Sequence, residues 1–175
     1  MEPVNKKLCK EWCSQNGFEI NGNVIFSSKQ EKRKKTVIFP ESYRGCAALV
    51  VSLSHYFQEF SSESLFWIRE WGIGSPEAED IGHLILKEIS PLPGLDSLWE
   101  FPGVQCGVAD AEHVRALLLL AMVHPWDASW IEKGGQSLIN VCHDGYITAA
   151  TCGPQEFDIV AWLSGWRWGP ETFVG

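Results

Sequence analysis

Three adjacent residues, Cys142, His143 and Asp144, carry a thiol, a base and a carboxylate. In nucleophilic catalysis a histidine takes the proton of the thiol, and a carboxylate orients the histidine. Neighbouring residues of a strand point to opposite faces, however, so the histidine that activates Cys142 would have to come from elsewhere in the fold. We therefore favour a turn in which Asp144 bonds the local backbone and Gly145 adopts a positive φ.

Two polar residues, His124 and Asp127, flank a Pro-Trp pair just upstream. His124 follows a long apolar segment, and a histidine in that place complements the last carbonyl groups of a helix. Asp127 precedes the next expected strand, and we expect it to anchor that strand. Both residues are thus assigned structural roles rather than catalytic ones.

Carboxylates are concentrated over residues 63–80, at Glu63, Glu70, Glu77, Glu79 and Asp80. Two carboxylates about 5 Å apart, or about 6.5–9.5 Å apart, would suit glycoside hydrolysis. In the first turn of a helix they would instead stabilise the helix dipole, and on a surface they would attract a basic partner. We favour the docking surface and add two C-terminal tryptophans, because tryptophan often anchors interfaces. The expected partner-binding residues are Glu70, Glu77, Glu79, Asp80, Trp166 and Trp168.

The segment Lys29–Lys35 holds five of the chain's fourteen Lys and Arg residues. A basic segment can contact nucleic-acid phosphates or form a solvated loop. We favour the loop, because no aromatic residue interleaves these charges. A nucleic-acid-contacting adaptor remains the alternative interpretation.

Six cysteines are scattered along the chain, without the spacing of a zinc site or of a small disulfide scaffold. We expect six free thiols and no metal. Neither a G-x-G-x-x-G motif nor a Walker-type loop is present, so no nucleotide cofactor is expected. The cysteines are Cys9, Cys13, Cys46, Cys106, Cys142 and Cys152.

The charge of the chain is unevenly distributed. Residues 1–45 hold nine Lys/Arg against five Asp/Glu, whereas residues 46–175 hold five against seventeen, and the net charge is −8. Such an acidic body repels nucleic acid and anionic membranes and favours a basic partner. No apolar run reaches the length that spans a bilayer, and no apolar segment typical of a secretory leader follows residues 1–7. We expect a cytoplasmic protein.

Helical and strand patterns alternate over the first 60 residues. Pro3 fits the first position of a helix with an apolar stripe at Val4, Leu8 and Trp12. Asn21-Gly22-Asn23 is typical of a hairpin turn. The expected elements are a helix over 3–16, a hairpin over 18–26, a strand over 36–39 and a helix over 43–57.

The segment 65–73 is too apolar for an exposed strand, and we expect a central strand covered on both faces. Trp67 and Trp71 should lie on one face, and Phe66 and Ile68 on the other. The later expected elements are a helix from Ser75 to Ile89, a short strand over 98–101 that ends at Pro102-Gly103 and can resume over 104–106, a helix over 111–123 capped by Asp110, a meander of strands over 129–131, 137–142 and 146–148, and a short helix from Pro154 to Gly165.

These elements predict an α+β fold, a single domain with a mainly antiparallel sheet packed against several helices. A length of 175 residues suffices for one sizeable core. Within it we distinguish a basic N-terminal helix and hairpin arm, 1–35, from an acidic core, 36–175.

Four motifs follow one another over residues 65–146: Trp67-x-x-x-Trp71-Gly72 before Ser75, Pro102-Gly103-Val104, the helix from Asp110 to Trp126-Asp127-Ala128, and Cys142-His143-Asp144-Gly145. Their order resembles a family of small uncharacterised bacterial proteins with a Trp-x-x-x-Trp-Gly strand, an Asp-capped apolar helix and a Ser/Cys-His-Asp turn. Val104 and Gly145 replace the family's histidine and glutamate. The resemblance implies a shared fold and a bacterial setting, but no activity.

The function that we expect is that of a non-catalytic binding protein. Within that class we favour an immunity-type inhibitor, which neutralises a cognate bacterial toxin through an acidic, tryptophan-bearing surface. Nuclease toxins are basic, and complementary charge speeds their capture. The alternatives are a small hydrolase or transferase that uses Cys142 or the carboxylates of Glu70, Glu77 and Glu79, and the adaptor that contacts nucleic acid through Lys29–Lys35.

Overall fold

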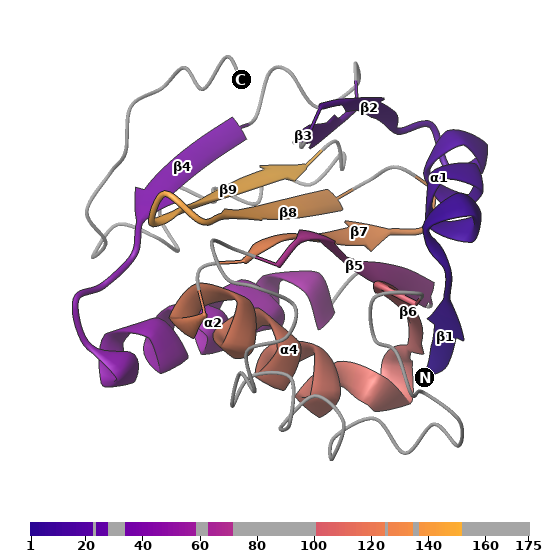
Figure 1. Ribbon diagram of the computed structural model, residues 1–175. Helices are drawn as coiled ribbons and strands as arrows, with labels where there is room; N and C mark the ends of the chain where they lie inside the picture. Colours follow the sequence, from indigo (N-terminus) through magenta and orange to yellow (C-terminus); the bar gives the residue numbers. More distant parts are fainter. Residues whose placement is uncertain are drawn as a thin grey trace.

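The computed structural model describes residues 1–22, 24–27, 34–58, 63–71, 101–124, 126–134 and 137–151 (Figure 1). The first half holds β1 (Glu2–Val4), α1 (Lys6–Gln15), β2 (Glu19–Asn21), β3 (Val24–Phe26), β4 (Lys34–Ile38), α2 (Tyr43–Gln58) and β5 (Glu63–Glu70). The second half holds β6 (Gly103–Gly107), the short 3-10 helix η2 (Val108–Asp110), α4 (Ala111–Val123), β7 (Asp127–Glu132), β8 (Ser137–Cys142) and β9 (Tyr146–Thr151).

Seven strands form one sheet in the order β1-β6-β5-β7-β8-β9-β4, and β2 and β3 form a separate hairpin. Every pair of neighbouring strands is antiparallel. The expected α+β domain with a mainly antiparallel sheet is therefore confirmed. So is the β7–β8–β9 meander, whose two turns place Gly134 and Gly145 at φ values of 83° and 89°.

β5 is the inner strand that the sequence predicts, paired with β6 on one side and β7 on the other. Phe66 is 1% exposed and Trp67 is 3% exposed. They point to opposite faces of the sheet, each into its own hydrophobic cluster. The prediction that Trp71 shares the face of Trp67 is wrong. A β-bulge between Ile68 and Glu70 shifts the alternation by one residue, so Trp71 packs on the face of Phe66 and Ile68.

The two faces of the sheet bury different sets of residues. Helices α2 and α4 cover one face over the larger cluster, to which Leu53, Leu118 and Ile139 belong (Figure 1). Helix α1 and the β2–β3 hairpin supply the smaller cluster on the other face, to which Trp12 and Ile25 belong. Burial of one such side chain stabilises the fold by about 1.5–3 kcal/mol.

The N-terminal helix begins later than the sequence suggests. Residues Glu2–Val4 form strand β1 against β6, and α1 begins after Asn5, whose side chain accepts a hydrogen bond from the backbone N–H of Leu8 at 3.0 Å. Asparagine is a strong N-cap, and this cap overrides the preference of Pro3 for a first helical turn. The buried stripe is consequently Cys9, Trp12 and Cys13, while Leu8 is 44% exposed.

The helices expected over 43–57 and 111–123 are confirmed as α2 and α4, and the hairpin over 18–26 as β2–β3. The helices expected over 75–89 and 154–165 lie outside the described residues. Within the described ranges, no helix combines the length and the apolar character needed to cross a membrane.

Candidate functional site

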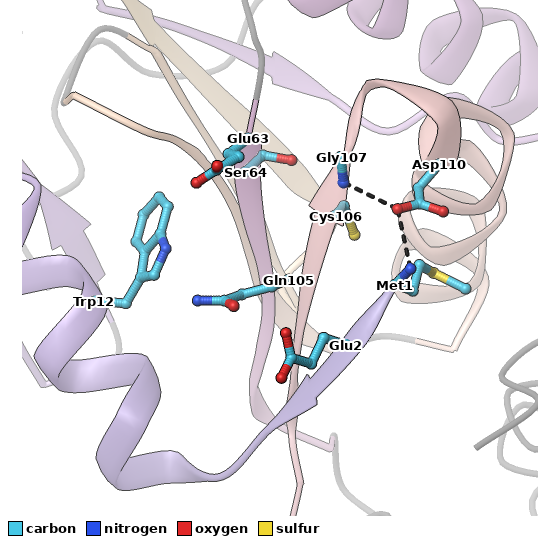
Figure 2. Close-up of a pocket in the computed structure, with 9 residues that line it drawn as sticks. All are labelled: Met1, Glu2, Trp12, Glu63, Ser64, Gln105, Cys106, Gly107 and Asp110. Atoms are coloured by element: carbon cyan, nitrogen blue, oxygen red, sulfur yellow. Dashed lines mark hydrogen bonds and ion pairs between the residues drawn. The ribbon is translucent and has the colours of Figure 1, made fainter. Parts of the chain in front are cut away.

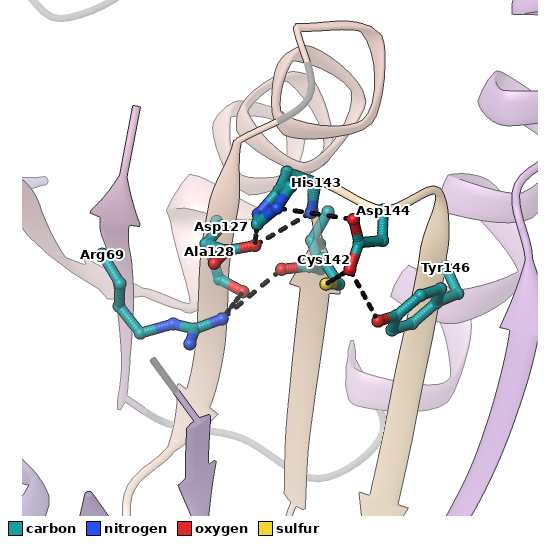
Figure 3. Close-up of polar contacts among 8 residues, drawn as sticks. Arg69, Asp127, Ala128, Cys142, His143, Asp144 and Tyr146 are labelled. Atoms are coloured by element: carbon teal, nitrogen blue, oxygen red, sulfur yellow. Dashed lines mark hydrogen bonds and ion pairs between the residues drawn. The ribbon is translucent and has the colours of Figure 1, made fainter. Parts of the chain in front are cut away.

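Polar side chains gather at the two opposite ends of the central strands. At the end of β5 marked by Glu70 lie the start of β7 and the β8–β9 turn. At the end marked by Glu63 lie the end of β6, the end of β7 and Trp12 of α1. We call the first group, defined by Arg69, Asp127, Cys142, His143, Asp144 and Tyr146, the turn cluster (Figure 3). The second is an acidic pocket (Figure 2).

Asp127 is the anchor of the turn cluster. It is the first residue of β7 and is 3% exposed. Its Oδ1 accepts a hydrogen bond from the backbone N–H of His143 at 2.9 Å. The same oxygen lies 3.0 Å from Nδ1 of the His143 ring. The carboxylate therefore ties the start of β7 to the turn that follows β8.

The turn places His143 between two carboxylates (Figure 3). Its Nε2 lies 3.5 Å from Oδ1 of Asp144, while its Nδ1 faces Asp127. Asp144 also accepts a hydrogen bond from the Tyr146 hydroxyl at 3.2 Å. Asp144 thus contacts side chains rather than the local backbone that the sequence suggests. The positive φ of Gly145 is as predicted.

These neighbours shift the pKa of His143 upward. Partial burial disfavours the imidazolium, but the hydrogen bond to Asp127 and the charges of Asp127, Asp144 and Glu70 outweigh burial. Behind the turn, Arg69 Nη2 donates to the carbonyl oxygens of Ala128 at 3.2 Å and Val141 at 3.4 Å. Its guanidinium interacts electrostatically with Asp127.

Cys142 is not prepared for nucleophilic attack. Burial is the main reason that the pKa of its thiol is raised, and the charges of Asp127 and Asp144 add to that effect. The sulfur lies 4.0 Å from Oδ2 of Asp144, which is a hydrogen-bond acceptor. A ring nitrogen of His143 lies within 4.8 Å of the sulfur, so the adjacent histidine is nearer than the sequence analysis expects. A protonated thiol at neutral pH is a weak nucleophile.

The sequence did not lead us to expect that Asp127 lies beside Cys142 and His143. One ligand-type atom from each of these three residues lies within 4.8 Å of the other two. Asp127 begins β7 and Cys142 ends β8, so the antiparallel register of this hairpin brings them together. The signal was the short Gly-containing turn between the two strands, which fixes their register.

The acidic pocket has a volume of about 470 Å³. Its lining is Met1, Glu2, Trp12, Glu63, Ser64, Gln105, Cys106, Gly107 and Asp110 (Figure 2). Three of these residues carry carboxylates, and they come from β1, β5 and η2. The pairing of β1 and β5 with the two edges of β6 places them around one hollow.

Two carboxylates of the pocket hold ammonium groups of the chain. Oδ2 of Asp110 lies 3.1 Å from the Met1 amino group and accepts from the Gly107 N–H at 2.9 Å. Burial opposes these two contacts, but together they lower the pKa of Asp110. Glu63 Oε2 lies 2.5 Å from Nζ of Lys133. Asp110 precedes α4 as predicted, although its carboxylate bonds Gly107 instead of the α4 amides.

The structure separates carboxylates that the sequence grouped. Glu63 and Glu70 lie at opposite ends of β5, which at strand spacing is about 23 Å. Glu70 is exposed and is the register partner of Asp127. Glu77, Glu79, Asp80, Trp166 and Trp168 lie outside the described residues, so the docking surface expected around them stays a prediction.

Two further predictions concern groups of residues of which the structure describes only a part. Of the segment Lys29–Lys35, the structure describes Lys34 and Lys35, which begin β4 rather than lying in a loop. Of the six cysteines, the five in the described ranges are free, as predicted. Cys152 lies outside those ranges.

Comparisons of this chain with protein-family models, with curated protein sequences and with solved structures find no match.

Proposed function

We propose that this protein is a non-catalytic binding protein of the immunity type, which acts in the cytoplasm and inhibits a basic bacterial toxin. The acidic pocket would receive a lysine or arginine side chain of that toxin. The observation that carries this proposal is the carboxylate-lined hollow beside Trp12, at whose rim Glu63 already binds the ammonium group of Lys133.

The chemistry of the pocket suits a cationic side chain. Glu2 and Glu63 supply negative charge, and the Gln105 side chain extends toward Trp12 across the hollow (Figure 2). A carboxylate forms charge-assisted hydrogen bonds with lysine or arginine, and an indole adds cation–π attraction where the cation meets its face. A volume of about 470 Å³ accommodates one such side chain.

The charge of the whole molecule favours the same partner. Residues 46–175 hold seventeen Asp/Glu against five Lys/Arg. A field of this sign raises the rate at which a basic protein associates, and the pocket would then fix its orientation. Because toxins that act on nucleic acids present basic surfaces, an acidic inhibitor can cover the surface that the toxin uses for its substrate.

The reading frames adjacent to the gene supply the test. The toxin domain of a neighbouring secreted protein is expressed with and without this chain, and growth is measured. We expect growth to be restored and the two proteins to form a complex, whose association rate falls as salt is raised. If no neighbouring product is inhibited or bound, the proposal is wrong.

Two variants locate the binding surface on the acidic pocket. The double variant Glu2→Gln/Glu63→Gln should slow association with the toxin, because it removes two charges from the hollow. Glu19→Gln, an exposed carboxylate of the β2–β3 hairpin, is the control and should leave the rate nearly unchanged. Equal rates for the double variant and the control would exclude the pocket as the docking site.

A further inference from the structure

The turn cluster contains the donor set of a metal site. The thiol of Cys142, the ring of His143 and the carboxylate of Asp127 each place one ligand-type atom within 4.8 Å of the other two. We propose that these three side chains bind one divalent transition-metal ion, with Zn²⁺ as the ion that fits them best. This site is independent of the proposed function, because it uses none of the residues of the acidic pocket.

The types of donor favour Zn²⁺ over other common ions. A thiolate and an imidazole are preferred ligands of Zn²⁺, and a carboxylate commonly completes its site. Mg²⁺ and Ca²⁺ prefer oxygen donors alone. On binding, the sulfur of Cys142 would coordinate as a thiolate, and its proton would pass to the solvent. The proton that His143 Nδ1 donates to Asp127 would also leave that nitrogen, either for Nε2 or for the solvent.

The distances require only small side-chain movements. Zn–S bonds of about 2.3 Å and Zn–N or Zn–O bonds of about 2.0–2.2 Å place the ligand atoms of a tetrahedral site about 3.3–3.6 Å apart. Nδ1 of His143 and Oδ1 of Asp127 are already 3.0 Å apart, and all three donors lie within 4.8 Å. Cys142 and His143 are half-buried, so their side chains have room to rotate toward an ion.

The backbone around the donors is held in place. Asp127 is buried, and the N–H of His143 fixes its carboxylate at 2.9 Å. Arg69 bridges the carbonyl oxygens of Ala128 and Val141, the residues directly after Asp127 and directly before Cys142. The contact to Asp127 orients a metal ligand directly, whereas Arg69 holds only the backbone of the two strands that carry Asp127 and Cys142.

Asp144 lies outside the group of three clustered donors and would become the fourth ligand only by a rotation of its side chain. Its Oδ1 lies 3.5 Å from His143 Nε2, and its Oδ2 lies 4.0 Å from Cys142 Sγ. Its side chain is 63% exposed, so it can turn toward an ion without the loss of a buried contact. Asp127, Asp144 and Glu70 together place three carboxylates around His143, and a divalent cation would reduce their mutual repulsion.

The test begins with protein treated with EDTA and desalted. Co²⁺ is added and followed by absorption spectroscopy, and Zn²⁺ is titrated by calorimetry. We expect one ion per chain, a thiolate-to-cobalt charge-transfer band and visible bands of a tetrahedral site. Cys142→Ser should remove the charge-transfer band. Asp127→Asn and His143→Gln should each weaken Zn²⁺ binding by at least about tenfold, and Asp144→Asn by less.

Matched controls separate this site from other thiols and imidazoles. Cys46→Ser keeps a donor for the Pro40 carbonyl, and His113→Gln alters a histidine on α4. Both should bind Co²⁺ as the unaltered chain does. Circular dichroism in EDTA verifies that each variant is folded. If Asp127→Asn proves to be unfolded, the metal site is judged from the Cys142→Ser result alone. The proposed metal site would be wrong if the folded chain bound no ion. It would also be wrong if the charge-transfer band persisted in Cys142→Ser or disappeared in Cys46→Ser.

Discussion

Carboxylates lie at both ends of β5, but their negative charge is balanced by different partners at the two ends. At the Glu70 end, Asp127 is buried and its oxygen is satisfied by the His143 backbone and ring. At the Glu63 end, carboxylates line an open hollow, and Lys133 binds one of them from the rim. A buried carboxylate needs partners supplied by its own chain, whereas a carboxylate at an open pocket can exchange its partner.

This difference assigns different chemistry to the two ends. The turn cluster combines sulfur, nitrogen and oxygen donors at short range, which suits a single ion. The acidic pocket combines carboxylates with an indole and an amide around a hollow of about 470 Å³, which suits a protruding side chain. Four substitutions test this contrast.

Replacement of the buried anchor should give the largest loss of stability. Asp127→Ala removes the acceptor of two His143 contacts and leaves the cation of Arg69 without its nearby carboxylate. We expect the free energy of unfolding to fall by about 2–4 kcal/mol, measured by urea denaturation in the presence of EDTA. Asp144→Ala, at an exposed carboxylate, should change it by less than about 0.5 kcal/mol. Equal losses of stability in Asp127→Ala and Asp144→Ala would show that the buried carboxylate of Asp127 is not what stabilises the turn cluster.

Between the two ends, where β6 pairs with Trp67 of β5 and with Val4 of β1, the backbone is packed too closely for a side chain at Gly103. A Cβ there would lie 2.2 Å from Cys9 Sγ and 3.0 Å from Val4 Cγ2. Gly103→Ala should therefore lower the free energy of unfolding by about 1–3 kcal/mol. Cys9→Ala in the same chain should recover part of this loss, because it removes the nearest atom. A double variant no more stable than Gly103→Ala would contradict this explanation.

The sequence predicts the helices and strands better than it predicts which of them lie side by side. Local signals placed α2, α4 and the meander correctly, since glycine turns and apolar periodicity act over a few residues. The start of α1 was misplaced because Pro3 suits a helix, yet residues 2–4 complete the sheet edge beside β6. Strand pairing across a hundred residues leaves no local signal.

The candidate sites were less predictable for the same reason. Asp127 and His143 are 16 residues apart, and Trp12 and Gln105 are 93 apart. The first proximity follows from the register of the β7–β8 hairpin, for which its Gly-containing turn is a local signal, whereas the second depends on how α1 packs on the sheet, for which the sequence holds no local signal. The β-bulge beside Ile68 could not be foreseen either, and it decided the face of Trp71.

A third substitution tests a buried acid near the pocket. Glu132, at the end of β7, is 2% exposed, and its Oε2 has no hydrogen-bond partner within the described ranges. Burial is the main cause of its raised pKa, which a hydrogen bond from Ser137 opposes. The native state therefore binds this proton more tightly than the unfolded state, so stability falls as pH rises from the ordinary glutamate pKa to the raised one.

Glu132→Gln should remove this loss. Relative to the unaltered chain, we expect the variant to gain about 1 kcal/mol at pH 7 and to gain less at pH 4, where the glutamate is largely protonated in both states. Urea denaturation at the two pH values measures the difference. Glu63→Gln, at an exposed carboxylate, is the control and should show little pH dependence. A gain that is the same at both pH values would rule out the carboxylate charge as its cause.

The smallest effect on stability, and a distinct effect on binding, is expected at the rim of the acidic pocket. Lys133 and Glu63 are both largely exposed, so loss of their ion pair in Lys133→Gln should cost less than about 1 kcal/mol. The same change removes the cation that competes with a basic partner for Glu63. Association with the toxin should therefore become faster, whereas Glu63→Gln makes it slower, and both differences should shrink at high salt. Stopped-flow association at two salt concentrations measures these rates. If Lys133→Gln slowed association, Lys133 would itself contact the partner, and the acidic pocket could not be the binding site for a cationic side chain.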